Sequence, residues 1–176
     1  MQIDMNEFYL RIYGDPVLRE KTEEVTEFGE QLAPLVERMY EVMYEEEGVG
    51  LAAPQVGSDL RMMVLDVPLE EGGAFRGVLI NPEVLETEGT QRDEEGCLSF
   101  PGIREEITRA DRIKVRARGV DGEPFTFEAN ALLSRAVQHE IDHLDGVLFI
   151  DRMSPVRRRL LAKKLKKLAE ERTAEV

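Results

Sequence analysis

The chain is 176 residues long, with 42% hydrophobic and 34% charged residues and a formal net charge of −13. This length favours one domain with a core of its own, and no apolar run approaches the ~18–20 residues of a membrane-spanning helix. Because phosphate contacts need a basic surface, the negative charge disfavours general binding to DNA or RNA.

The cysteine content and the first residues bear on the cellular compartment. Cys97 is the only cysteine, so no intrachain disulfide can form, which is typical of a reducing compartment. The first ten residues, MQIDMNEFYL, lack the basic start and apolar stretch of a secretory signal. We therefore expect a cytoplasmic protein without a membrane contact.

The first half of the chain contains one helical pattern and two short strand patterns. An amphipathic helix is predicted over residues 29–47, with Gly48 as its C-terminal stop, from the spacing of Leu32, Leu35, Val36, Met39 and Met43. The apolar runs 62–65 and 78–80 are short and lie near prolines, which favours strands over helices.

The second half predicts a hairpin and two helices. Apolar and basic residues alternate over 113–118, a turn follows at Asp121-Gly122, and Phe125 and Phe127 alternate beyond it. Residues 131–145 lack Gly and Pro and are predicted to be helical. Pro155 opens a final helix over 155–172, with one apolar stripe formed by Leu161, Leu165 and Leu168.

These elements predict an α+β fold in which the antiparallel strands are segregated from the helices. No repeat or linker interrupts residues 1–176, so we expect a single domain. The charge is uneven, since residues 151–176 hold nine Lys or Arg and only four acidic residues. This basic helix is either a solvated face that pairs with the acidic body or a surface for a partner.

The segment His139-Glu140-Ile141-Asp142-His143 indicates a metal site. Residues four apart on a helix point the same way, so both imidazoles can reach one ion. Glu140 lies about 100° around the helix, where its carboxylate can reach a water bound to that ion. The alternative is that both histidines are ordinary polar helix residues.

Two histidines leave a catalytic metal one protein ligand short, because such sites usually have three. The third ligand is either one of many acidic residues or the thiolate of Cys97. A lone cysteine is more often a small buried hydrophobic residue, so the residue pattern by itself leaves this choice open.

Three stretches resemble the signature motifs of the peptide deformylase family. They are residues 48–55 (GVGLAAPQ), 95–99 (EGCLS) and 138–143 (QHEIDH), in the order and at the separations of bacterial members. The opening residues 13–19 (YGDPVLR) and the basic C-terminal helix are also similar. Val49, where many members have isoleucine, is a small departure that leaves the chemistry unchanged.

The resemblance implies antiparallel sheets packed around a central metal-binding helix, with an N-terminal and a C-terminal helix. It implies that Cys97, His139 and His143 bind one divalent ion, natively Fe²⁺ and often replaced by Zn²⁺ or Ni²⁺. The implied reaction removes the N-formyl group from the first methionine of a nascent polypeptide and releases formate.

The resemblance also assigns catalytic roles. Glu140 would be the general base and acid, and Gln55 and the backbone N–H of Leu98 would stabilise the oxyanion. These types suit the chemistry, because an amide N–H donates without adding a net charge and a carboxylate can move a proton. Without the resemblance, Gln55 would be interpreted as an ordinary loop glutamine.

The substrate's methionine needs an apolar slot beside the metal. Leu132 and Ala136 precede the histidines on one helix face and can line that slot together with Val49, although ordinary core packing is equally compatible with each. Gly50 lets the backbone approach a ligand closely. Arg104 resembles a family position that contacts the substrate backbone, and its alternative is a surface arginine.

The resemblance also implies a contact of the basic C-terminal helix with ribosomal RNA, which some members of the family make. Its candidate residues are Arg157, Arg158, Arg159, Lys163, Lys164, Lys166 and Lys167. Two other functions remain open from the residues alone. One is a metallopeptidase with the same helical His-Glu-His arrangement, and the other is a ribosome- or RNA-binding module with a structural metal.

Overall fold

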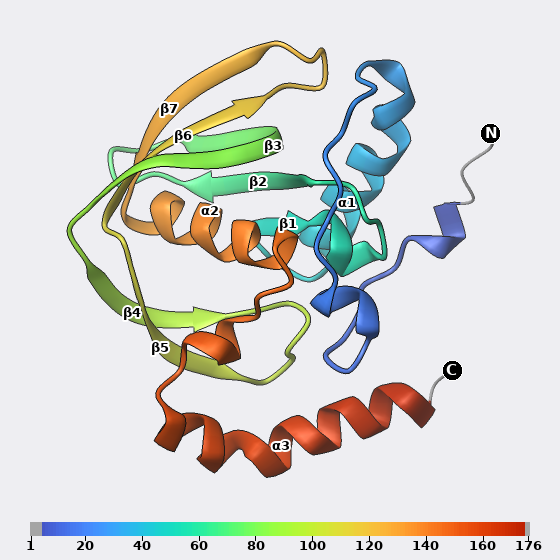
Figure 1. The fold of residues 1–176 in the computed structure, drawn as a ribbon, viewed down its shortest axis with the longest axis vertical. Coiled ribbons are helices and arrows are strands. Elements are labelled where there is room, and N and C mark those ends of the chain that lie inside the picture. Colours follow the sequence, from blue (N-terminus) through green and yellow to red (C-terminus); the bar gives the residue numbers. More distant parts are fainter. Residues whose placement is uncertain (1–4, 175–176) are drawn as a thin grey trace.

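The computed structural model describes residues 5–174 and has the predicted α+β architecture (Figure 1). Helix α1 (Ala33–Glu45), helix α2 (Ala131–Leu144) and helix α3 (Pro155–Ala174) are the three long helices of this part of the chain. Residues 1–4, which belong to the segment used to exclude a secretory signal, lie outside the described residues.

Two antiparallel sheets face each other across helix α2 (Figure 1). The larger has the order β1-β2-β3-β6-β7, with β1 (Gly50–Ala52), β2 (Met62–Pro68), β3 (Ala74–Glu88), β6 (Arg112–Arg118) and β7 (Pro124–Asn130). The smaller pairs β4 (Gln91–Gly96) with β5 (Arg104–Arg109). This confirms the predicted fold class, including the central helix between the sheets.

Most predicted elements are confirmed with adjusted bounds. The runs 62–65 and 78–80 lie inside β2 and β3, and the alternating segments around Asp121-Gly122 form the β6–β7 hairpin. The strand pair β4–β5 was not predicted, because β4 reads QRDEEG and has no apolar alternation. It nevertheless carries the chain directly into Cys97.

The prediction for the first helix was wrong at both ends. A 3-10 turn occupies Glu30–Leu32 and the α-helix ends at Glu45, two residues before the predicted end. The left-handed residue of the stop is Glu47, with φ 56°, and not Gly48. Gly48 is needed for space, since a Cβ there would lie 2.7 Å from Cδ1 of Leu98.

Helix α2 packs its apolar residues against the larger sheet, whereas its polar side chains Arg135 and Asp142 bind residues of the smaller one. Leu133, Ala136 and Val137 pack into a core cluster with residues of β2, β3 and β6. Leu165 of α3 packs into a second cluster with Phe100 and Phe149, which attaches the C-terminal helix beneath the small sheet. No helix among residues 5–174 is long and apolar enough to cross a membrane.

Candidate active site

A cleft of about 780 Å³ opens between α2, β1 and the segment that follows β4. Its walls contain ten of the residues singled out from the sequence: Val49, Gly50, Gln55, Cys97, Leu98, Arg104, Leu132, Ala136, His139 and Glu140. Residues from three distant parts of the chain therefore meet at one surface.

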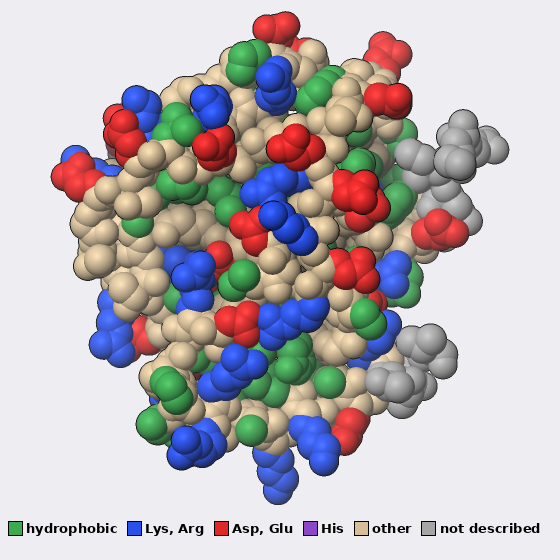
Figure 2. Space-filling view, in the orientation of Figure 1, with side chains coloured by type: hydrophobic (Ala, Val, Ile, Leu, Met, Phe, Trp, Pro, Cys, Tyr) green, Lys and Arg blue, Asp and Glu red, His purple; other side chains and the backbone are tan. Residues whose placement is uncertain are grey.

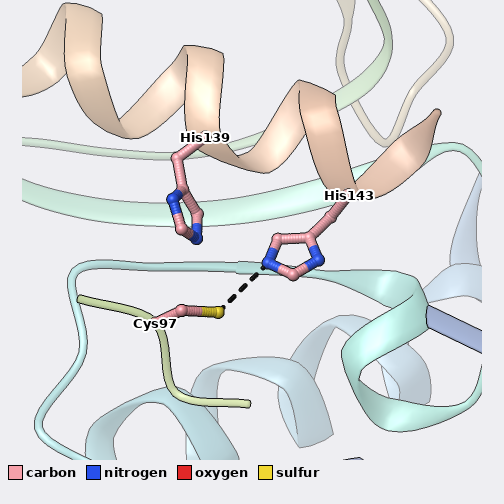
Figure 3. A group of neighbouring side chains, drawn as sticks. All are labelled: Cys97, His139 and His143. Atoms are coloured by element: carbon pink, nitrogen blue, oxygen red, sulfur yellow. Dashed lines mark hydrogen bonds between the residues drawn. The ribbon is translucent and has the colours of Figure 1, made fainter. Parts of the chain in front are cut away.

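The three predicted metal ligands converge at the floor of this cleft (Figure 3). One ligand atom from each of Cys97, His139 and His143 lies within 4.8 Å of the others, and Cys97 Sγ is 3.3 Å from Nε2 of His143. The two imidazoles project from successive turns of α2, as their spacing of four predicts. His143 is the deeper ring, only 1% exposed.

This donor set fits a divalent transition-metal ion. One thiolate and two imidazoles make three protein ligands, the usual number in a catalytic site that keeps one position open. Soft sulfur together with imidazole nitrogen suits zinc, iron or nickel rather than magnesium or calcium. A structural metal site normally has four protein ligands. The group found among the described residues supplies three.

Glu140 lies beside the candidate ligands and is 5% exposed. Burial raises the pKa of its carboxyl group to about 7. Its Oε2 is buried and has no hydrogen-bond partner among the described residues. Gly50 creates the room for this side chain, since a Cβ at that position would lie 3.0 Å from Glu140 Oε1.

Glu95, which also lines the cleft, orients the first histidine. Its Oε2 lies 2.6 Å from Nδ1 of His139. Burial opposes a charge on Glu95, but hydrogen bonds from His139 and Arg109 hold its pKa well below the usual range. A carboxylate can only accept, so Nδ1 donates and Nε2 is left to bind an ion.

The two rings differ electrostatically. Burial disfavours a charge on His139, yet the neighbouring Cys97 sulfur and Glu95 carboxylate raise its pKa well above the ordinary value. Burial, followed by the field of His139, lowers the pKa of His143 well below it. The raised pKa means that the surroundings of His139 favour a positively charged ring, that is, a bound proton. The same surroundings favour a metal cation in place of that proton.

Gln55 is held on both sides of its amide. Its Oε1 accepts from the backbone N–H of Ala52 at 3.0 Å, and its Nε2 donates to Oγ of Ser99 at 3.1 Å. The same nitrogen lies 3.7 Å from Cys97 Sγ, so a fixed donor faces the candidate metal centre. Leu98 follows Cys97 directly in the cleft wall.

The predicted substrate-binding residues lie further out. Val49 and Ala136 line the interior, whereas Leu132 is 42% exposed. The side chain of Arg104 is 62% exposed at the rim and forms an ion pair with Glu94 at 2.9 Å. The sequence-based alternative, a surface arginine, is thus compatible with its position as well.

Sequence reasoning did not assign roles to Glu95, Arg109, Arg135 or Asp142, which form a buried network behind His139. A signal was present for Arg109, because period two along β5 places it on the same buried face as Ile107. Arg135 likewise precedes His139 by four residues on α2. Neither pattern says which acid each arginine binds.

Fold and site together define an α+β protein with a candidate thiolate-and-imidazole metal centre, a buried carboxyl group beside it and a substrate-sized cleft. The model of the family "Polypeptide deformylase" matches residues 9–159. A peptide deformylase of Acidobacterium capsulatum is 53% identical over 156 residues, covering 89% of this chain and 92% of the relative. One of Thermotoga maritima is 50% identical over 163 residues, covering 92% and 96%.

Solved structures agree with these relatives. A plant peptide deformylase superposes with a TM-score of 0.90 at 36% identity, covering all of this chain and 96% of that one. The crystal structure of the Thermotoga maritima enzyme gives 0.77 at 50% identity, with 84% and 98% covered. The chain belongs to the polypeptide deformylase family, a family of metal-dependent hydrolases that remove the N-formyl group from nascent polypeptides. The metallopeptidase and RNA-binding alternatives are not favoured.

Proposed function

We propose that Cys97, His139 and His143 hold one divalent ion and that the natural ion is Fe²⁺, which Zn²⁺ or Ni²⁺ can replace. The observation that carries this proposal is the convergence of the three ligand atoms within 4.8 Å at the floor of the cleft. When bound, the ion would lower the pKa of a coordinated water from 15.7 to about 7 and so supply a nucleophile near neutrality.

Glu140 moves the protons of the reaction. It accepts a proton from the attacking water as the new C–O bond forms on the formyl carbon, and it delivers that proton to the amine nitrogen as the C–N bond breaks. Formate and a free N-terminal amine are the products. The pKa of about 7 suits both roles, because the carboxyl group can bind and release a proton near neutral pH.

Gln55 and the backbone N–H of Leu98 stabilise the negative charge that develops on the former formyl oxygen. The amide of Gln55 is fixed by Ala52 and Ser99, so it needs little reorganisation when that charge appears. Removal of one such donor typically costs ~10²–10³ in rate.

The remaining cleft residues bind the N-formylmethionyl peptide. Val49, Leu132 and Ala136 supply the apolar slot for the methionine side chain, and Gly50 allows the peptide backbone to approach. Arg104 at the rim contacts the backbone of the following residues, which requires it to exchange its exposed ion pair with Glu94.

Formate release from formyl-Met-Ala-Ser tests this mechanism. A Glu140→Ala variant that still binds metal should turn over ~10²–10⁴-fold more slowly than the wild type, the usual contribution of a general acid-base group. Glu106→Ala is the matched control, because that side chain is 54% exposed and outside the cleft. Comparable turnover in the two variants would contradict the assigned role of Glu140.

The identity of the metal has its own test. A thiolate ligand donates charge and is oxidisable, so we expect the iron-loaded enzyme to lose activity in air while the nickel-loaded enzyme keeps it. Metal analysis of anaerobically purified protein should find iron. Full activity of the iron form after prolonged aerobic storage would contradict the assignment of Fe²⁺.

A second proposal concerns the cytoplasmic encounter with the ribosome. Basic side chains gather over α3 (Figure 2), but Arg157, Arg158 and Lys164 already bind Glu105, Asp151 and the carbonyl of Gly102. The predicted solvated, body-pairing face therefore accounts for part of α3. We therefore assign the proposed RNA contact to four residues of α3 that point away from the body: Arg159, Lys163, Lys166 and Lys167.

Cosedimentation with ribosomes at increasing salt tests this contact. Replacing these four outward residues by glutamine should weaken binding and flatten its salt dependence, because each phosphate contact releases counterions. Four exposed arginines on the strands, Arg92, Arg112, Arg116 and Arg118, provide a control variant with the same change in charge. Equal loss in both variants would remove the support for α3.

A further inference from the structure

Four hydrogen bonds fix the two oxygens of Glu95. Oε2 accepts from Nδ1 of His139 at 2.6 Å and from Arg109 at 2.7 Å. Oε1 accepts from Nε of Arg109 at 3.1 Å and from Arg135 at 2.9 Å. All four side chains are less than one-tenth exposed, so water does not compete for these contacts. The carboxylate has no freedom to rotate away from His139.

This carboxylate also joins the two segments that carry the candidate ligands. Glu95 is on β4, two residues before Cys97, whereas His139 and His143 are on α2. Arg109, at the end of β5, binds Glu95 through two nitrogens and Asp142 of α2 through the third, at 2.6 Å. The strand pair and the helix are thereby tied together at the level of the metal centre.

Asp142 closes the network toward the surface. It accepts two further hydrogen bonds, at 2.5 and 2.7 Å, from Arg152 in the 3-10 turn Phe149–Arg152. Two carboxylates and three guanidinium groups thus form this network. Replacing buried ion pairs by apolar residues of similar size often leaves a protein at least as stable, so stability does not explain why these charges are here. Their retention is explained by orientation, since a guanidinium fork fixes a carboxylate in two directions at once.

We propose that Arg109 and Arg135 are positioning residues for the metal ligand His139 and that they act through Glu95. They hold the ring so that Nε2 meets the Cys97 sulfur and His143 in the geometry that the ion needs, before the ion arrives. The inference rests on the proposed metal site. It predicts that the two arginines set metal affinity without touching the ion.

Metal binding by Arg109→Lys tests the proposal. Lysine keeps the charge but cannot make the two parallel bonds to Glu95. We expect the Kd for Zn²⁺, measured by chelator competition, to rise 10–100-fold, as is usual when a group behind a ligand is altered. The cobalt-loaded variant should show a changed absorption spectrum, because the ligand geometry is altered.

Arg61→Lys is the matched control. Arg61 also anchors α2, through the C-cap residue Asp145 at 2.8 Å, but makes no hydrogen bond or ion pair with Glu95 among the described residues. The unfolding midpoint of each metal-free protein, measured in parallel, separates loss of stability from loss of affinity. We expect the control to bind Zn²⁺ as tightly as the wild type even where its midpoint falls.

The outcomes are distinguishable from failure of the metal site itself. A wild type that binds no metal would defeat the proposed function. A wild type that binds, with Arg109→Lys and Arg61→Lys binding equally tightly, would overturn the positioning role alone. If Arg109→Lys does not fold, Arg135→Met decides, because it removes the one hydrogen bond of Arg135 to Glu95: a several-fold rise in Kd supports the proposal and an unchanged Kd overturns it.

Discussion

Arg109 and Lys167 show how differently two ion pairs of this molecule are built. Arg109 lies 2.7 Å from Glu95, with side chains 2% and 6% exposed. Lys167 on α3 lies 3.7 Å from Glu171, with side chains 76% and 59% exposed. The first pair is shielded from solvent and shares its carboxylate with a candidate metal ligand, whereas the second is surrounded by water.

Burial decides what each pair contributes. Exposed pairs are screened by water and salt and add ~0–1 kcal/mol at most. In a buried pair, loss of one partner leaves an unpaired charge in a poorly solvated region, which costs far more than the intact pair contributes. We infer that charge in the core of this enzyme serves orientation, while exposed pairs on α3 such as Lys167–Glu171 contribute little to stability.

The largest expected effect comes from opening the buried network. Asp142→Asn removes a carboxylate that both Arg109 and Arg152 bind and leaves Arg109 with Glu95 alone, so it should lower the free energy of unfolding by about 3 kcal/mol or more. Glu171→Gln makes the same chemical change on α3 and should cost less than ~0.5 kcal/mol. Urea unfolding of both metal-free proteins measures the difference. Similar losses of unfolding free energy in the two variants would contradict the claim that burial decides what an ion pair contributes.

The comparison extends to uncharged donors. Gln55 is 1% exposed and faces the candidate metal centre, whereas Gln31 is exposed and donates to the carbonyl of its neighbour Phe28. Gln55→Ala should lower kcat for formyl-Met-Ala-Ser by ~10²–10³, equivalent to about 3–4 kcal/mol, and Gln31→Ala should leave it unchanged. A loss confined to KM would show that Gln55 binds the ground state instead of the oxyanion.

The buried carboxyl group of Glu140 predicts a pH dependence of stability in the metal-free protein. Its pKa rises from 4.5 to about 7 on folding, because burial disfavours the charged form. The stabilisation from the protonated group is therefore complete below pH 4.5 and is lost as pH rises through 7.

In the Glu140→Gln variant the side chain cannot ionise, so the stability of this variant should not fall in this way as pH rises. Relative to the wild type, the variant should gain up to roughly 3 kcal/mol between about pH 5 and about pH 8, as measured by denaturant unfolding. The difference reports Glu140 together with its electrostatic coupling to His139. A constant difference across this range would mean that Glu140 titrates normally in the folded chain.

Periodicity explains which parts of the fold were predictable. The β6–β7 hairpin repeats an apolar spacing that matches one buried face, and the stripe Leu161, Leu165 and Leu168 of α3 packs against the body, whereas α2 was predicted from the absence of Gly and Pro over 131–145. Strand β4 has no such repeat, since it is stabilised by pairing with β5 and by cross-strand ion pairs such as Arg104–Glu94. Polar strands of this kind depend on a partner that local sequence does not reveal.

The site divides in the same way. The spacing of His139 and His143 was enough to predict that both side chains lie on one face of a helix. Cys97 lies more than forty residues away in sequence, so only the family resemblance identified it as a ligand. The contact of Arg109 with Glu95 depends on the register of the β4–β5 hairpin and on how α2 packs against it. Such a contact is a property of the assembled fold.

X-ray absorption of the zinc-loaded protein tests the central claim most directly. One ion held by Cys97, His139 and His143 should give one sulfur at about 2.3 Å and two imidazole nitrogens at about 2.0–2.1 Å. The sulfur shell should vanish in Cys97→Ala. A wild-type spectrum with nitrogen and oxygen neighbours only would contradict the account.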